Sequence, residues 1–117
     1  MGEEHIFAMC RGFYRELEAS SLRPLFPKDM EEASRRTAAF FVGVLGGPPL
    51  YRQLYGPPRM RQRHLAFPID AEAREVWLGC FKRILSDATG KYAFPAEHLP
   101  GFIDYLEEFS AWMVNRR

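Results

Sequence analysis

Hydrophobic residues recur at three- and four-residue steps along most of the chain, which is the spacing of one face of an α-helix. The predicted helices span residues 3–19, 30–45, 50–55, 59–67, 71–87 and 96–115. No stretch alternates between hydrophobic and polar residues in the manner of a β-strand. We therefore predict an all-α fold.

Prolines, glycines and capping residues mark where these helices begin and end. Two prolines within residues 22–27 predict a corner, because a proline does not fit the interior of a regular helix. Asp29 followed by Glu32 resembles a capping box, and Asp70 is a good N-cap for the helix that follows it. The pair Gly46-Gly47 predicts the end of the preceding helix.

Length and charge narrow the class of protein. No repeat or long linker divides the chain, so residues 1–117 are expected to form one domain. The 16 basic and 15 acidic side chains give a net charge of +1, without the basic excess of a nucleic-acid-binding protein. The N-terminus has no signal-peptide pattern, and the longest apolar run, Ala38 to Leu45, is too short to span a bilayer. We expect a cytoplasmic protein that neither inserts into membranes nor binds nucleic acid.

Aromatic residues are frequent, with 10 Phe, 5 Tyr and 2 Trp in a short chain. Their rings can fill a large core or line a pocket for a flat apolar ligand, and composition alone does not choose between these roles. Cys10 and Cys80 both lie within apolar helical patterns, so we interpret them as buried free thiols.

One histidine stands in an apolar stripe. On a helix, Met60, His64 and Phe67 share a narrow arc of one face, while Arg59 and Arg63 share another. A haem site needs one neutral imidazole for the iron, apolar groups beside the macrocycle and cations for the propionates. The spacing alone leaves open the alternative that His64 is a hydrogen-bonded core residue and the arginines are a solvated face.

Other chemistries find less support in the sequence. The histidines His5, His64 and His98 share no zinc-motif spacing, and neither cysteine has a nucleophile signature around it. Gly46-Gly47 stops a helix and does not follow a strand, so it is not a phosphate-binding loop.

Several separate motifs, in order and spacing, resemble the group II truncated haemoglobins. They are Phe13-Tyr14, Leu25-Phe26-Pro27, Gly46-Gly47, Arg63-His64-Leu65-Ala66-Phe67-Pro68-Ile69 and Trp77-Leu78-Gly79-Cys80. The resemblance covers about residues 10–115 and implies a truncated globin fold, a two-over-two helical sandwich around haem b.

The resemblance also implies roles for individual residues. His64 corresponds to the proximal iron ligand, and Tyr14 and Trp77 correspond to distal hydrogen-bond donors to a bound gas. The residues expected to contact the haem are Phe26, Arg36, Thr37, Phe40, Met60, Arg63, Phe67 and Ile69. Of these, Arg63 and then Arg36 are the candidates for propionate contacts. Two departures reduce the distal polar network, because Phe26 stands where some members carry tyrosine and Ala33 occupies the distal histidine or glutamine position.

The expected function is binding of dioxygen, and also of carbon monoxide and nitric oxide, by a monomer or homodimer. With Ala33 on the distal side, we expect an iron that is five-coordinate or water-bound at rest. One alternative is a haem-dependent redox enzyme, such as a nitric oxide dioxygenase or peroxidase, which would use a reductase partner. A remote alternative is a cofactor-free helical interaction module, in which His64 and the aromatic residues only fill the core.

Overall fold

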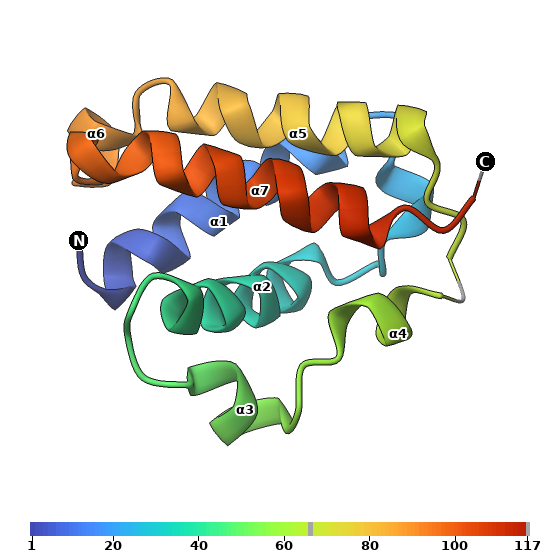
Figure 1. Ribbon diagram of the computed structural model, residues 1–117, viewed down its shortest axis with the longest axis horizontal. Coiled ribbons are helices and arrows are strands. Elements are labelled where there is room, and N and C mark those ends of the chain that lie inside the picture. Colours follow the sequence, from blue (N-terminus) through green and yellow to red (C-terminus); the bar gives the residue numbers. More distant parts are fainter. Residues whose placement is uncertain (66, 117) are drawn as a thin grey trace.

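The computed structural model describes residues 1–65 and 67–116, and every regular element in these ranges is helical. The α-helices are α1 (Glu3–Glu18), α2 (Met30–Val44), α3 (Leu50–Tyr55), α4 (Met60–His64), α5 (Ala71–Leu85), α6 (Ala88–Lys91) and α7 (Leu99–Met113) (Figure 1). Two 3-10 helices, η1 (Arg23–Leu25) and η2 (Ala96–His98), complete the described elements. The prediction of an all-α fold is confirmed.

Two pairs of long helices form the body of the molecule. Helix α1 packs against α2, and α5 packs against α7, while α1 also contacts α5 and joins the two pairs. In Figure 1, α5 and α7 run side by side in opposite directions, and α3 and α4 lie below α2. This is the predicted two-over-two sandwich.

Aromatic rings fill the centre where the pairs meet. Phe13 of α1, Phe41 of α2 and Phe81 of α5 are almost completely buried. The ring of Phe81 lies 4.1 Å from that of Phe13 and 5.6 Å from that of Phe41, measured between centroids. Aromatic pairs at such distances stabilise a fold by roughly 0.5–1.5 kcal/mol beyond the burial of their area. The aromatic residues thus supply much of the core.

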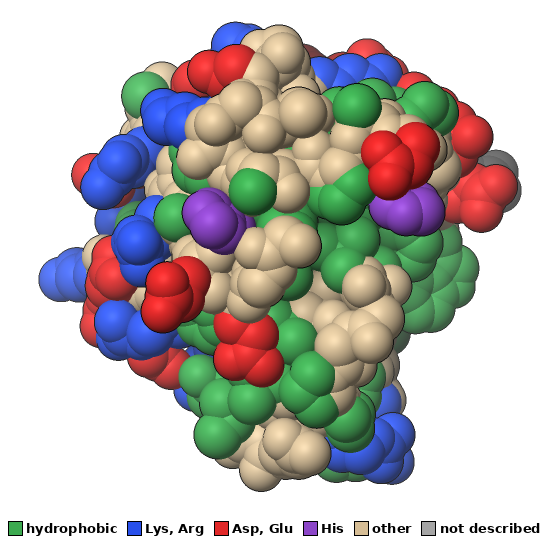
Figure 2. Space-filling model, turned by 90° about the vertical axis from the view of Figure 1, so that its left-hand side faces the viewer, with side chains coloured by type: hydrophobic (Ala, Val, Ile, Leu, Met, Phe, Trp, Pro, Cys, Tyr) green, Lys and Arg blue, Asp and Glu red, His purple; other side chains and the backbone are tan. Residues whose placement is uncertain are grey.

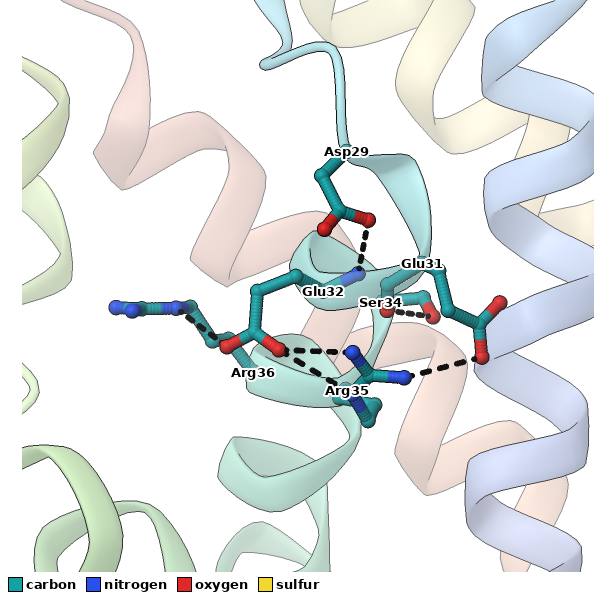
Figure 3. A network of polar contacts seen from close by, with 6 residues as sticks. All are labelled: Asp29, Glu31, Glu32, Ser34, Arg35 and Arg36. Carbon is teal, nitrogen blue, oxygen red and sulfur yellow. Dashed lines mark hydrogen bonds and ion pairs between the residues drawn. The ribbon is translucent and has the colours of Figure 1, made fainter.

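The predicted caps are present, although one forms only in part. The carboxylates of Asp29 and Asp70 accept hydrogen bonds from the backbone N–H groups of Glu32 and Ala73, at 3.0 and 2.8 Å. The Glu32 side chain does not complete a capping box, because its carboxylate is bonded to the neighbouring arginines of α2 (Figure 3). Asp29 therefore acts as a simple N-cap.

The end of α2 requires glycine. Gly46 has a φ of +94°, which is the left-handed region that glycine adopts without steric cost. The Gly47 N–H bonds the carbonyl of Val42 at 2.8 Å, and a Cβ at Gly47 would lie 2.8 Å from the Val42 side chain. The close return of the chain explains why both positions are glycine.

Helix α3 agrees with the predicted 50–55, whereas α4, α6 and the start of the last helix differ from the prediction. The predicted 59–67 helix is limited to Met60–His64. Arg59, which is left-handed with a φ of +41°, precedes it, and Leu65 is its C-cap. Ala66 of that segment lies outside the described residues. Helix α6 was expected to be loop, and the last helix begins at Leu99, after η2, with Pro100 in its first turn. Proline fits there because first-turn N–H groups have no partner inside the helix.

The surface carries both signs of charge. On the face in Figure 2, basic and acidic side chains lie among hydrophobic ones and neither sign forms a continuous layer. Among the residues that the structure describes, no helix combines the length and hydrophobicity required to cross a membrane.

Candidate functional site

A large cavity lies between α2, α4, α5 and α7 and reaches Tyr14 on α1. Its volume is about 580 Å³, within the range of small-molecule and cofactor pockets. The lining is mostly hydrophobic, with charged side chains from α2, α4 and α5 among it. A cavity of this size and polarity suits a largely apolar ligand that carries a few charged groups.

Every candidate site residue named from the sequence lines this one cavity. They are Tyr14, Phe26, Arg36, Thr37, Phe40, Met60, Arg63, His64, Phe67, Ile69 and Trp77. Ala33 lines it as well. Residues separated by more than sixty positions in the sequence are therefore brought together by the fold.

His64 occupies the last position of α4. Its Nδ1 lies 2.7 Å from the carbonyl oxygen of Met60, one turn earlier. A carbonyl oxygen only accepts hydrogen bonds, so Nδ1 carries the proton and donates it. The lone pair of the neutral ring is then on Nε2, which is the nitrogen left to bind a metal. A backbone acceptor on the other ring nitrogen is the usual partner that fixes the tautomer of a metal-binding histidine.

The segment that carries His64 is tied to the residues after α7. The Asn115 side-chain amide donates to the carbonyls of His64 and Phe67, at 3.2 and 3.0 Å, and accepts from the Ile69 N–H at 2.9 Å. In addition, the Arg61 Nε donates to the carbonyl of Trp112 at 3.0 Å. Asn115 could not be identified from the sequence, because a single polar residue beyond a helix forms no pattern.

Tyr14 is a buried polar group on the side of α1 and α2. Its hydroxyl lies 2.6 Å from the Thr37 hydroxyl, and either oxygen can donate. Burial is the main effect that raises the pKa of Tyr14 to about 12, while the Thr37 hydrogen bond acts in the opposite direction. The phenol therefore stays protonated at neutral pH and remains a hydrogen-bond donor.

Aromatic neighbours hold Tyr14 and Trp77 in position. The Phe13 ring packs edge to face against both, with centroids 5.6 Å from Tyr14 and 5.4 Å from Trp77. Phe26 packs on the other side of Tyr14 at 5.7 Å, and Phe109 of α7 lies 6.5 Å from Trp77. The phenol and the indole thus belong to one aromatic wall, and each carries a polar group that can donate.

Two arginines at the cavity are fixed by neighbours of different kinds. Arg36 is bonded through Nε to Glu32 at 3.3 Å (Figure 3), and its guanidinium lies 4.6 Å from the centre of the Tyr55 ring. Arg63 donates to the carbonyls of Pro57 and Pro58, at 3.2 and 2.8 Å. Both are exposed, so these contacts orient the cations at the cavity mouth, where they can meet an anionic group.

Arg74 was not predicted as a site residue, although it lines the cavity. Its guanidinium bridges α5 and α7, with Nε donating to the Ser110 hydroxyl at 3.1 Å and Nη2 donating to the Glu107 carbonyl at 3.0 Å. Its position three residues before Trp77 puts both on one helix face, and this spacing was the available signal.

Protein ligands for a metal do not cluster in the described part of the chain. No group of three or more His, Cys, Asp or Glu residues within 1–65 and 67–116 is placed to hold an ion. Cys10 and Cys80 are buried free thiols, as expected, and burial raises the pKa of Cys10 to about 12.

Comparisons with known proteins agree with this geometry. The model of the bacterial-like globin family matches residues 1–115. The group 2 truncated hemoglobin YjbI of Bacillus subtilis is 36% identical over 99% of this chain and 86% of its own. The crystal structure of the group II truncated hemoglobin from Bacillus anthracis superposes with a TM-score of 0.89 at 31% identity, covering 98% of this chain and 86% of that one. The X-ray structure of the truncated oxygen-avid haemoglobin from Bacillus subtilis superposes with a TM-score of 0.86 at 36% identity, covering 97% of this chain and 94% of that one.

Proposed function

The chain belongs to the bacterial-like globin family and resembles its group II truncated haemoglobins throughout, and on this premise we propose that it binds haem b in the central cavity through His64. Haem is the cofactor that the family implies. The observation that carries the proposal is the hydrogen bond from His64 Nδ1 to the Met60 carbonyl, which leaves Nε2 free to bind a metal. The porphyrin itself would lie against the apolar lining of the cavity.

The residues around the cavity fit the remaining parts of a haem. Phe26, Phe40 and Met60 supply apolar contacts for a flat macrocycle. Arg63 and Arg36 lie at the mouth as cations for the two propionates, since a guanidinium can bind a carboxylate through two hydrogen bonds. Arg63 remains our first candidate, because its side chain bonds backbone carbonyls and forms no ion pair with an acidic group among residues 1–65 and 67–116, whereas Arg36 is paired with Glu32.

When bound, ferrous haem supplies an iron atom that can hold a diatomic gas. Tyr14 would donate a hydrogen bond from the side of α1, and Thr37 would orient the phenol when its hydroxyl is the donor of the Tyr14–Thr37 pair. The Trp77 indole is the second donor, and Ala33 leaves space without adding a polar group. Hydrogen bonds to a partner that carries charge are worth roughly 1.5–3 kcal/mol, so two donors would slow gas release.

We propose dioxygen as the main ligand, with carbon monoxide and nitric oxide binding at the same position. The similarity to the Bacillus subtilis protein that is called oxygen-avid supports this assignment. A redox enzyme would use the same cavity, so turnover of nitric oxide with a reductase separates an enzyme from an oxygen carrier.

The test is a set of absorption spectra of the protein supplied with haem, in the ferric, ferrous and carbon-monoxide-bound forms, beside His64→Ala. We expect a sharp Soret band that shifts with carbon monoxide and changes in the variant. His98→Ala is the matched control, because His98 is exposed at the end of η2, and its spectra should equal those of the wild type. Spectra like those of free haem in every protein would reject the proposal.

A further inference from the structure

Helix α4 is too short to hold its own position. It has five residues, and an isolated helix of that length does not form in water. The left-handed Arg59 stands before it and Pro68 follows shortly after, so it is not the continuation of a longer helix. The position of His64 therefore depends on contacts with the rest of the molecule.

Asn115 supplies contacts at the C-terminal end of this segment. Its amide nitrogen donates to the carbonyls of His64 and Phe67, and its amide oxygen accepts from the Ile69 N–H. The backbone adds two more bonds, since the N–H groups of Asn115 and Arg116 donate to the Ile69 carbonyl at 2.8 and 3.0 Å. Asn115 thus connects the backbone of His64, Phe67 and Ile69 to the end of α7.

The three side-chain bonds require a carboxamide. The two carbonyls only accept and the N–H only donates, so the partner needs two donors and one acceptor at a fixed spacing. An aspartate has almost the same shape, but its second oxygen would face the two carbonyls without a proton to donate.

We propose that Asn115 is a positioning residue, which holds the His64 backbone so that the imidazole reaches the iron at a fixed place. This inference rests on the proposed function, in which His64 is the iron ligand. Asn115 acts through the His64 carbonyl and does not line the cavity.

Two measurements on the haem-loaded protein test the inference. The first is the rate of haem loss to a scavenging apoglobin, and the second is the iron–histidine stretching line in the resonance Raman spectrum of the ferrous form. In Asn115→Asp we expect haem loss to be about ten-fold faster, as the loss of two hydrogen bonds implies. The Raman line should broaden or shift, because the imidazole is no longer held in one position.

Arg61→Ala is the control for a general loosening of α4 from α7. It removes a bond from α4 to the Trp112 carbonyl but leaves the His64 carbonyl contact in place, so the Raman line should equal that of the wild type. Asn115→Ala is the second variant, and it should resemble Asn115→Asp while circular dichroism shows unchanged helix content.

The outcomes distinguish the positioning role of Asn115 from the role of His64 as the iron ligand. Wild-type haem loss and a wild-type Raman line in both Asn115 variants would overturn the role of Asn115 while leaving His64 as the ligand. An iron–histidine line that is absent from the wild type would overturn the proposed function, and the inference with it.

Discussion

A hydroxyl group has one proton to donate, and this decides how the Tyr14–Thr37 pair can work. The two oxygens are 2.6 Å apart, so one hydroxyl donates to the other. If Thr37 is the donor, the Tyr14 proton is left for a ligand in the cavity. In that arrangement, the Thr37 hydroxyl orients the phenol.

Removal of the Tyr14 hydroxyl should therefore speed the release of dioxygen. In Tyr14→Phe we expect a dissociation rate at least about ten-fold faster, because a hydrogen bond to a charged partner is worth roughly 1.5–3 kcal/mol. Stopped-flow displacement of dioxygen by carbon monoxide measures this rate. Tyr105→Phe makes the same chemical change outside the cavity lining and should release dioxygen at the wild-type rate. Equal rates in the wild type and Tyr14→Phe would contradict a distal role.

The buried Cys10 thiol should make the fold sensitive to alkali. Burial raises the pKa of Cys10 from 9.0 to about 12, so the folded protein holds a proton that the unfolded chain loses. The stabilising contribution is complete below pH 9 and declines as the pH rises toward 12. The pKa of Tyr14 is raised from 10.0 to about 12, so this phenol adds a further loss of unfolding free energy between pH 10 and 12.

Urea unfolding at pH 8 and pH 11 tests this effect. Between these values, Cys10→Ala should lose less free energy of unfolding than the wild type does, by about 3 kcal/mol, taking 1.36 kcal/mol for each pKa unit. Cys80→Ala is the comparison and should have the smaller effect, since burial also raises the pKa of Cys80 but the neighbouring Arg83 opposes that rise. The same pH dependence in the wild type and Cys10→Ala would mean that the thiol ionises inside the folded protein.

At the scale of the helices, the Arg74 side chain joins α5 to α7 through hydrogen bonds. Its guanidinium reaches a hydroxyl and a carbonyl of α7, and 27% of its side chain is exposed. The pairing thus keeps the helix that carries Trp77 in register with the helix that carries Phe109.

Arg74→Met should destabilise the protein while keeping most of the side-chain volume. We expect a loss of about 1–2 kcal/mol after allowance for solvent screening, and a melting temperature lower by several degrees. Calorimetry measures both values. Arg83→Met is the control, because the Arg83–Glu16 ion pair is exposed and should contribute less than about 1 kcal/mol. Equal losses in the two variants would show that the α5–α7 bond contributes no more than a surface pair.

Helices α1, α2 and α5 and the short helix α3 could be predicted from the sequence, whereas α6 and the limits of α4 could not. Helices α1, α2 and α5 show several turns of hydrophobic spacing and end at recognisable caps, so their limits agree within two residues. Helix α6 has only four residues, which is too short for a periodic pattern. Helix α4 was predicted too long at both ends, and the left-handed backbone at Arg59, which precedes its first residue, has no signal in the sequence.

The candidate site divides in the same way. His64, Tyr14 and Trp77 stand in motifs whose order and spacing are recognisable, and all three line the cavity. Asn115 contacts backbone groups 46 to 51 positions away, and such a contact leaves no periodic trace in a single sequence. Short sequence motifs identified residues of the cavity lining, whereas the hydrogen bonds from Asn115 that hold the His64 segment are evident only in the structure.

For the whole molecule, the size of the cavity predicts that haem contributes to folding. A space of about 580 Å³ lined mainly by apolar side chains loses packing when nothing fills it. A ligand that binds only the folded state raises its stability by mass action, by about 4 kcal/mol at a thousand times its dissociation constant.

Thermal unfolding of the haem-free and haem-loaded proteins, followed by circular dichroism, measures this contribution. We expect the melting temperature to rise by several degrees on loading, and to rise less in His64→Ala than in His98→Ala. Identical melting temperatures with and without haem would indicate that the cavity does not hold it.

The position of α7 along the chain has a consequence for biosynthesis. Helix α4 leaves the ribosome well before Phe109, Ser110 and Met113, which complete the cavity wall, and before Asn115, which fastens the segment behind His64. A nascent chain that has exposed His64 but not α7 would offer an imidazole with no pocket around it. Cofactor capture is therefore expected to follow translation of residue 115, so that a truncated product has no closed site in which to retain a reactive iron compound.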